Sequence, residues 1–304
     1  MLRGRDLISI ADLSSQELDG VLQTAMALKD AGRQPLLAGK TLALVFEKPS
    51  LRTRVSLHVA MRHLGGDCIY LSPPEVGLGD RETPADVARV LSRYVDCIAA
   101  RTFTMETVQE LARYAEVPVI NALSETEHPC QALADLLTIR EKKGRLAGIN
   151  VAFIGDGNNV ANSLALSAAI CGMRLRIASP PGYELSEGVL RRAQELAPAG
   201  VDQLHEPAEA VRDADVVYTD VWASMGHERE AGVRKEDFAG YTVDAELMSH
   251  AKQDAIFMHD LPAHRGQEVT NEVIEGPQSV VFDQAENRLH AQKALLTLLL
   301  GEEE

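Results

Sequence analysis

The chain has 304 residues, of which 45% are hydrophobic, and this is enough for two α/β domains of ordinary size, each with its own core. Its formal net charge of −15 argues against nucleic-acid binding, because proteins that bind a phosphate backbone usually present a basic face. No apolar run of about 18 residues occurs and the N-terminus lacks an apolar signal-peptide core, so we expect a cytoplasmic protein with no membrane partner. The four cysteines stand singly, which indicates neither a disulfide framework nor a zinc site.

Short β-branched or apolar runs alternate with segments of helical period along almost the whole chain. This alternation is typical of parallel strands that are joined by crossover helices. The predicted strands are Thr41–Phe46, Cys68–Leu71, Asp96–Ala100, Val117–Ala122, Asn150–Ile154, Arg174–Ala178, Val216–Thr219, Ala255–His259 and Ser279–Phe282. We therefore predict an α/β fold with two domains, each a parallel sheet flanked by helices.

Helix signals fall between these strands. Thr83 can cap a helix whose first residue is Pro84, with Asp86 completing a capping box. Gly144 can end a helix that starts near residue 129, and a leucine-rich helix is expected over about residues 285–300. The charged, glycine-containing stretch 142–148 is the expected crossing between the two domains.

Ligands of open parallel sheets bind outside the carboxyl ends of the strands, so the loops that follow the strands are the expected binding loops. Those with polar or charged groups are Glu47–Ser50, Arg101–Phe103, His128–Gln131, Gly155–Asn159, Asp220–Trp222, Asp260–Pro262 and Asp283–Arg288. In an acidic protein, an anionic ligand needs a local cationic pocket, so arginines in these loops are the most informative residues.

The segment Ser50-Leu51-Arg52-Thr53-Arg54 follows a predicted strand and opens a helix. Backbone N–H groups, two hydroxyls, the positive end of the helix dipole and two guanidinium groups would converge there on a tetrahedral anion. We interpret the segment as a phosphate site. A capping serine followed by two solvated arginines is the alternative that the same residues allow.

The nine residues Phe46-Glu47-Lys48-Pro49-Ser50-Leu51-Arg52-Thr53-Arg54 resemble the carbamoyl-phosphate signature of the aspartate/ornithine carbamoyltransferase family. Further motifs follow in the family's order. Ala100–Phe103 is similar to the family's second arginine loop, and His128-Pro129-Cys130-Gln131 is similar to its His-Pro-x-Gln motif. Gly155–Asn159 and Asp220–Gly226 are similar to the ornithine branch, and Ala285–Arg288 is similar to the closing motif. The set is highly specific, although no single motif is.

The resemblance implies transfer of the carbamoyl group of carbamoyl phosphate to the side-chain amine of L-ornithine, which gives L-citrulline and phosphate and belongs to arginine biosynthesis. It implies homotrimers with active sites shared between subunits, and we expect no cofactor. It also implies a carbamoyl-phosphate-binding domain of residues 1–143 and 288–304, completed by the C-terminal helix, and an amino-acid-binding domain of residues 144–287.

The resemblance also implies roles for particular residues. Those implied in carbamoyl-phosphate binding are Ser50, Leu51, Arg52, Thr53, Arg54, Glu75, Arg101, His128, Gln131, Asp260, Leu261 and Arg288. Those implied in ornithine binding are Asn159, Asp220, Ser224 and Met225. The expected catalytic residues are Arg52, Arg101, His128, Asp220 and Asp260, and no metal is expected.

Elementary chemistry agrees with these roles. Carbamoyl transfer needs a neutral amine that attacks a carbonyl, and it places negative charge on the carbonyl oxygen and on a leaving phosphate, so no covalent nucleophile is required. Arginines and a histidine directed at this charge lower the barrier, since removal of one such donor typically costs about 2.7–4 kcal/mol. Holding both substrates in attack geometry supplies about 7–11 kcal/mol in favourable cases.

Two positions of the predicted site depart from the family's pattern. Most members of the ornithine branch have a cysteine beside the reacting amine where this chain has Asp260, and Glu75 stands where a glutamine that reaches the neighbouring subunit's phosphate site is expected. A carboxylate at position 75 repels phosphate unless an arginine or lysine pairs with it. His58 also replaces the usual glutamate. Lineage drift with compensation elsewhere is the alternative explanation for all three.

Other functions are compatible with parts of the sequence. Gly155-Asp156-Gly157 suggests a dinucleotide site, but Val160 replaces the third glycine of that motif. His259, Asp260 and His264 have the chemistry of metal ligands, but their spacing fits no helical pair. A catalytically weak homologue that serves as a binding or regulatory subunit is a third possibility. Putrescine or an acylated ornithine remains possible as the acceptor, whereas the ornithine-like motif disfavours aspartate.

We hypothesise that Asp260 is an alternative base or orienting group. An ionised Asp260 favours the protonated form of the acceptor amine, whose ordinary pKa is about 10.4 by analogy with lysine, and a protonated amine cannot attack. The rate optimum of Asp260→Cys should therefore lie at lower pH than that of the native protein. The check is the rate of ureido-product formation by both proteins between about pH 6 and 10. An unchanged profile would exclude this role.

Overall fold

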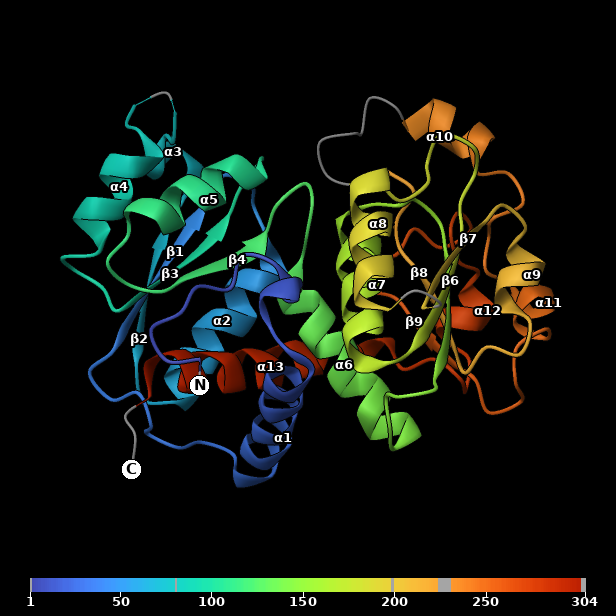
Figure 1. Ribbon diagram of the computed structural model, residues 1–304, viewed down its shortest axis with the longest axis horizontal. Coiled ribbons are helices and arrows are strands. Elements are labelled where there is room, and N and C mark those ends of the chain that lie inside the picture. The colour runs from blue at the N-terminus through green and yellow to red at the C-terminus, as the bar shows by residue number, and fades with distance from the viewer. Residues whose placement is uncertain (1, 80, 198–199, 224–230, 302–304) are drawn as a thin grey trace. The chain divides into compact units, whose positions relative to one another are not determined.

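The computed structural model describes residues 2–79, 81–197, 200–223 and 231–301. It confirms the predicted α/β class, with two parallel sheets flanked by helices (Figure 1). The chain divides into two compact units, of which the first is Met1–Leu137 with Glu286–Glu304 and the second is Thr138–Ala285. The first unit is therefore discontinuous in sequence.

The first unit is built on a four-stranded sheet with the order β2-β1-β3-β4. Its strands are β1 (Thr41–Phe46), β2 (Asp67–Leu71), β3 (Cys97–Arg101) and β4 (Val119–Leu123). Its helices are η1 (Ile10–Asp12), α1 (Ser15–Ala31), α2 (Leu51–His63), α3 (Pro73–Val76), α4 (Pro84–Leu91) and α5 (Met105–Tyr114), together with the start of α6 (Pro129–Lys143) and most of α13 (Val281–Leu300). Figure 1 shows α4 and α5 on one face of the sheet and α2 and α13 on the other. Because both faces are covered, β1 and β3 are almost wholly buried and read as continuous apolar runs.

The second unit is built on a five-stranded sheet with the order β7-β6-β5-β8-β9. Its strands are β5 (Asn150–Ile154), β6 (Arg174–Ala178), β7 (Val201–Leu204), β8 (Val216–Thr219) and β9 (Ile256–Met258). Its further helices are α7 (Asn159–Cys171), α8 (Glu187–Leu196), α9 (Pro207–Val211), α10 (Ala231–Asp237), α11 (Ala245–Met248) and α12 (Asn271–Ile274). Figure 1 shows α7 and α8 on one face of the sheet and α9, α11 and α12 on the other.

One predicted strand was wrong, and one observed strand was not predicted. The segment Ser279–Phe282 is not a strand, because Val281 begins α13 and only Ser279 forms an isolated bridge, to Phe257. Its β-branched valines suit either structure, and packing of Val281 in the core decides for the helix. The edge strand β7 was missed because its short sequence, Val-Asp-Gln-Leu, has little apolar signal.

The predicted helix boundaries are confirmed at α4 and α6. Thr83 caps α4 by accepting a hydrogen bond from the backbone N–H of Asp86, but the Asp86 carboxylate pairs with Arg89, so the predicted capping box is only half formed. Gly144 follows the last residue of α6 with a φ of 74°, a left-handed conformation that favours glycine at this position.

The strand order reverses direction once in each sheet. In the first unit the reversal lies between β1 and β3, and in the second it lies between β5 and β8. Loops that follow two such strands diverge and leave a crevice at the carboxyl end of the sheet. The fold therefore places Glu47–Ser50 beside Arg101–Phe103 in one unit, and Gly155–Asn158 beside Asp220 in the other.

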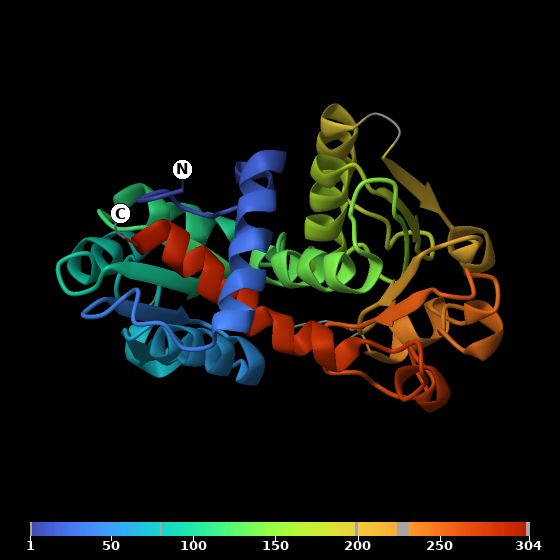
Figure 2. The same cartoon turned by 90° about the horizontal axis from the view of Figure 1, so that it is seen from below.

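Helix α1 is held against α13 by a buried lysine. Lys293, on α13, donates hydrogen bonds to the carbonyl oxygens of Leu28 at 2.8 Å and Gly32 at 2.5 Å, at the C-terminal end of α1. Figure 2 shows α1 crossing α13 at this point. A cation that meets the last carbonyls of a helix satisfies groups that lack intrahelical partners and complements the helix dipole.

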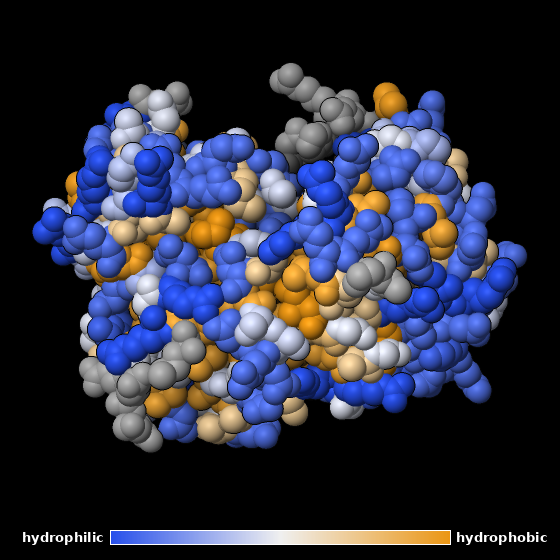
Figure 3. All heavy atoms as spheres, in the orientation of Figure 1, coloured by the Kyte–Doolittle hydropathy of each residue, from blue (hydrophilic) through white to orange (hydrophobic). Residues whose placement is uncertain are grey.

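The described chain has no helix that is both long and apolar enough to cross a bilayer. The face drawn in Figure 3 carries mostly hydrophilic residues, with hydrophobic ones in smaller groups between them.

Phe238 lies at the centre of the core of the second unit. It is fully buried and contacts the rings of Tyr183, Trp222 and Tyr241 with centroid separations of 4.8, 5.4 and 5.9 Å. We predict that Phe238→Ala lowers the free energy of unfolding by about 3–5 kcal/mol, because it leaves a cavity among these rings. Chemical denaturation followed by circular dichroism measures the change.

The matched control is Phe282→Ala, since the Phe282 side chain is 64% exposed. It should change the stability by less than about 0.5 kcal/mol. Equal losses for the two variants would contradict the assignment of Phe238 as a core residue.

Candidate active site

Arg288 is the centre of a buried polar cluster in the first unit. Its Nη2 donates to the Thr53 hydroxyl at 2.7 Å, and its Nη1 donates to Oε1 of Gln131 and lies 3.4 Å from Nε2 of His128. All four side chains belong to residues with at most 3% exposure. Three segments that are distant in sequence, at the starts of α2 and α6 and within α13, therefore meet at one guanidinium group.

His128 is held in its neutral form by this environment. Burial is the main cause that lowers its pKa well below the ordinary value, and the charges of Arg288, Arg101 and Arg52 lower it further. An arginine has no acceptor, so Nε2 of His128 accepts from Arg288 and the proton of the neutral ring lies on Nδ1. The ring is thus a neutral hydrogen-bond donor among cations.

The N-terminus of α2 presents the predicted phosphate segment. Ser50 caps the helix by accepting a hydrogen bond from the backbone N–H of Thr53 at 3.3 Å. Arg52 is partly buried, and its charge acts on His128. The Leu51 side chain is 76% exposed, so the group that this residue can offer a ligand is its backbone N–H at the start of the helix.

Arg54 and Glu75 interact with each other and with nearby residues rather than with the Arg288 cluster. The guanidinium carbon of Arg54 lies 3.7 Å from the ring centroid of Tyr70. The Glu75 carboxylate accepts hydrogen bonds from the backbone N–H and the hydroxyl of Ser72. These bonds, together with the charge of Arg54, lower the pKa of Glu75. The positive charge of Arg54 therefore acts on Glu75, although the hydrogen bonds of its carboxylate are made with Ser72.

The loops after β1 and β3 are joined directly. The backbone N–H of Glu47 donates to the Arg101 carbonyl at 2.8 Å, and the Glu47 carboxylate accepts from the backbone N–H of Phe103 at 2.7 Å. Arg101 is 4% exposed and its charge acts on His128. The crevice between these strands thus carries Arg101 close to the Arg288 cluster.

Asp220 directly follows β8, where the strand order of the second sheet reverses. One carboxylate oxygen accepts from the backbone N–H of Val221 and the other from the Asn158 side chain, both at 2.7 Å. Asn158 also caps α7 through the backbone N–H groups of Val160 and Ala161. Asn158 was not among the predicted site residues, although its capping position directly after a strand is a signal that sequence reasoning can use.

Asp260 follows β9 and lies beside Asp220. Ligand atoms of Asp220, His259 and Asp260 all lie within 4.8 Å of one another. Burial raises the pKa of Asp220 well above its ordinary value, and the charge of Asp260 raises it further. Two carboxyl groups therefore lie together where the resemblance to the carbamoyltransferases implies one carboxylate and one thiol.

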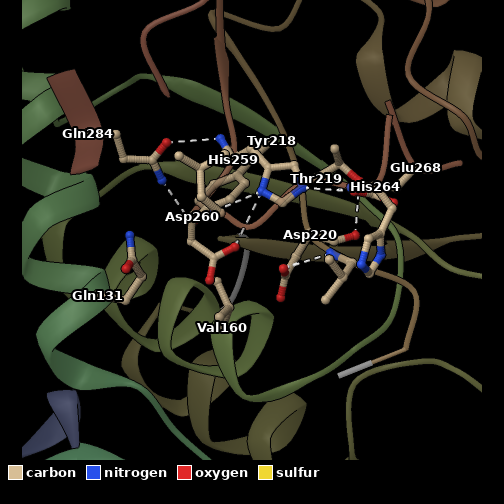
Figure 4. A network of polar contacts seen from close by, with 12 residues as sticks. Gln131, Val160, Tyr218, Thr219, Asp220, His259, Asp260, His264, Glu268 and Gln284 are labelled. Carbon is tan, nitrogen blue, oxygen red and sulfur yellow. Dashed lines mark hydrogen bonds and ion pairs between the residues drawn. The ribbon is translucent and has the colours of Figure 1, made fainter. Parts of the chain in front are cut away.

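A second layer of hydrogen bonds holds the His259 ring behind Asp260 (Figure 4). Nε2 lies 3.2 Å from a Glu268 oxygen, Nδ1 accepts from the backbone N–H of Leu261 at 2.9 Å, and the His259 backbone N–H donates to Gln284. Burial disfavours protonation of the ring and so lowers the pKa of His259, whereas the carboxylates of Asp260 and Glu268 act to raise it. Glu268 was not among the predicted site residues.

The arrangement favours hydrogen bonding over metal ligation. Both ring nitrogens of His259 have partners, so the ring has no unused lone pair for a cation. His264, which the sequence suggested as a third ligand, supplies its backbone N–H to Glu268.

Asn159 is the first residue of α7, directly after the capping asparagine, whereas Ser224 and Met225 lie outside the described residues. Trp222, close to the end of the described segment 200–223, stacks on the ring of Phe238 in the core. Its carbonyl accepts from Arg234 at 2.7 Å, and Arg234 also pairs with Asp156.

Two family models match the chain. The model described as "Aspartate/ornithine carbamoyltransferase, carbamoyl-P binding domain" matches residues 5–141, and the one described as "Aspartate/ornithine carbamoyltransferase, Asp/Orn binding domain" matches residues 147–299. The ornithine carbamoyltransferase of Pyrococcus abyssi is 54% identical over 99% of this chain and 97% of its own length. That of Bacillus subtilis is 53% identical over 98% of this chain and 95% of its own length.

The fold is similar to that of solved structures. The structure of ornithine carbamoyltransferase from Pyrococcus furiosus matches with a TM-score of 0.96 and 52% identity, covering 100% of this chain and 99% of that one. The fold and these matches define an α/β transferase of the carbamoyl-transferring class. The chain belongs to the aspartate/ornithine carbamoyltransferase family.

We predict that His128 stays neutral well below pH 6.5, about the ordinary pKa of histidine, because burial and the nearby arginines oppose its protonation. A pH titration of the ring nitrogens by NMR measures this, with His128→Gln used to assign the signal. In Arg288→Gln the pKa should rise, because one neighbouring cation is lost. In Arg62→Gln, which changes an exposed arginine in the last turn of α2, it should not move. Titration of native His128 near pH 6.5 would contradict the assignment.

Proposed function

We propose that the chain transfers the carbamoyl group of carbamoyl phosphate to the side-chain amine of L-ornithine and forms L-citrulline and phosphate. The observation that carries the proposal is the match over almost the whole chain, at more than 50% identity, to proteins named ornithine carbamoyltransferase. The polar clusters of the two units support it, because one is rich in cationic groups and the other in carboxylates.

The first unit, with the proposed domain limits 1–143 and 288–304, has the chemistry to bind carbamoyl phosphate. The N-terminus of α2, Arg52 and Arg101 provide positive charge for the phosphate. Arg288, Gln131 and neutral His128 provide hydrogen-bond donors for the carbamoyl group. Donors that are fixed before the reaction stabilise charge as it develops on the carbonyl oxygen and on the leaving phosphate.

The second unit, proposed as residues 144–287, has the chemistry to bind an amino acid with a side-chain amine. Asp220 is a buried carboxylate whose position is set by Asn158. Together with Asn159, Ser224 and Met225 it is proposed to hold the α-amino and α-carboxylate groups. Asp260 then lies beside Asp220, where a side-chain amine can meet it.

We propose a homotrimer as the working form, with Glu75 close to a phosphate site of a neighbouring subunit, and a cytoplasmic location. The positive charge of Arg54, which acts on Glu75, supports this role because it reduces the repulsion between the carboxylate and phosphate. One relative, from Pyrococcus furiosus, is named as anabolic, which supports a role in arginine biosynthesis.

The test is formation of ureido product and phosphate from carbamoyl phosphate, with L-ornithine, putrescine, N-acetyl-L-ornithine and L-aspartate supplied separately. We expect citrulline with L-ornithine and no product with the other three. Product with another amine only would move the proposal to that acceptor. Binding of carbamoyl phosphate without product from any amine would support a non-catalytic homologue and overturn the proposed function.

Variants of Arg52 and Arg62 form a matched pair, because both residues lie on α2. Arg52→Gln should lower kcat/KM for carbamoyl phosphate by about 10²–10³, as expected for loss of one donor to a developing anion. Arg62→Gln, at the exposed far end of α2, should change it by less than about twofold. Steady-state kinetics with saturating L-ornithine measures both, and equal effects would remove Arg52 from the proposed phosphate site.

A further inference from the structure

We infer that Asp220 and Asp260 hold one proton between them, and that this pair accepts the proton of the attacking amine. The inference rests on the proposed function and deepens it, since it assigns the proton acceptor of that reaction to a residue that departs from the family's usual cysteine. The contacts that support it all lie within the second unit.

The geometry brings the two carboxyl groups together away from water. Asp220 is 6% exposed and the Asp260 side chain is 14% exposed, and their oxygens are within 4.8 Å. Two ionised carboxylates this close in a buried position repel each other, so such pairs retain one proton. Asp220 accepts hydrogen bonds from Asn158 and Val221, which favour an ionised member. One acid and one carboxylate satisfy both conditions.

The His259 ring is an unsuitable place for the amine's proton. Its neighbouring carboxylates raise its pKa, but the backbone N–H of Leu261, 2.9 Å from Nδ1, requires a lone pair on that atom. The competing contact from Nδ1 to Asp260 is longer, at 3.5 Å, and a backbone amide does not give up its proton. The single ring proton therefore lies on Nε2, where it is donated to Glu268.

Two further carboxylates near the pair have partners of their own. Glu268 is fully buried and accepts from the ring of His259 and from the backbone N–H of His264. Asp156, in the loop after β5, is paired with Arg234 at 2.5 Å. The negative charge of the Asp220–Asp260 pair therefore attracts an ammonium group without competition from Asp156, which has a cationic partner.

The proton movements balance as follows. An N–H bond of the side-chain ammonium breaks, and its proton goes to the ionised oxygen of the Asp220–Asp260 pair. The freed electron pair forms the N–C bond to the carbamoyl carbon, and the C–O bond to phosphate breaks with its electrons on the phosphate. The second proton of the nitrogen goes to the leaving phosphate, and the pair later releases its extra proton to solvent.

The first test detects the shared proton in the free protein. Infrared spectra of protein with ¹³C-labelled aspartate distinguish a buried carboxylic acid from ionised carboxylates. We expect the acid band at neutral pH in the native protein and in Asp202→Asn, which changes an exposed aspartate on β7. We expect the band to shift in Asp260→Asn and Asp260→Cys, because the acid then loses the carboxylate beside it, while burial still favours protonation of Asp220. Absence of the band from the native protein would overturn the inference.

The second test follows the proton's role in catalysis. In Asp260→Asn, kcat at neutral pH should fall by about 10²–10⁴, the usual share of a general base, and should recover as pH rises and the amine loses its proton in solution. A loss that is the same at every pH would show a structural role and overturn the assignment. Glu268→Gln distinguishes proton transfer to the Asp220–Asp260 pair from proton transfer through His259 to Glu268. If the pair holds the proton, this variant should keep the acid band.

Failure of the proposed function would be recognised separately. In that case the native protein forms no citrulline, whereas failure of the present inference leaves native turnover intact and changes only the acid band or the pH dependence of Asp260→Asn.

Discussion

The guanidinium group of Arg288 is the interaction on which the first unit depends. It binds Thr53, Gln131 and His128 from two other helices, so it determines where the starts of α2 and α6 lie relative to α13. A buried cation is stable only when polar groups surround it, and here those groups are also the ones that the family's motifs contain. The same contacts that hold the helices together thus prepare hydrogen-bond donors for an anion.

The two polar clusters show opposite solutions to burial of charge. In the first unit, several arginines surround a histidine that stays neutral, so positive charge accumulates without a competing imidazolium. In the second unit, carboxyl groups accumulate, and a backbone amide and an asparagine donate hydrogen bonds that stabilise negative charge on Asp220. The first arrangement suits an anionic substrate and the second suits an amine.

Sequence patterns predicted the fold well where burial is uniform along an element. The strand Thr41–Phe46 was predicted with its observed limits, because a central parallel strand reads as a continuous apolar run. The same logic failed at Ser279–Phe282, where a valine-rich segment begins a helix, and at β7, an edge strand with few apolar residues. Tertiary packing, rather than local propensity, determines whether such segments form strands or helices.

The candidate site could be predicted as far as its motifs extend. Thr53, His128, Gln131 and Arg288 were all named from the sequence, and the structure brings their side chains together. Asn158 and Glu268 were not, because each acts by orienting another residue, and such contacts join positions 62 and 9 residues apart without a motif of their own. The roles of all these residues toward substrates remain predictions.

The discontinuity of the first unit has a consequence for synthesis of the protein. Ribosomes release the chain from the N-terminus, so α1, α2 and the start of α6 emerge long before α13. Arg288 of α13, which binds side chains at the starts of α2 and α6, and Lys293 of α13, which binds the end of α1, are therefore synthesised late. Until then, Thr53 and Gln131 lack their cationic partner, whereas the second unit is already almost complete. A nascent or prematurely terminated chain can therefore contain a folded second unit beside an unfinished first one, and the anion-binding cluster is among the last parts of the molecule to form.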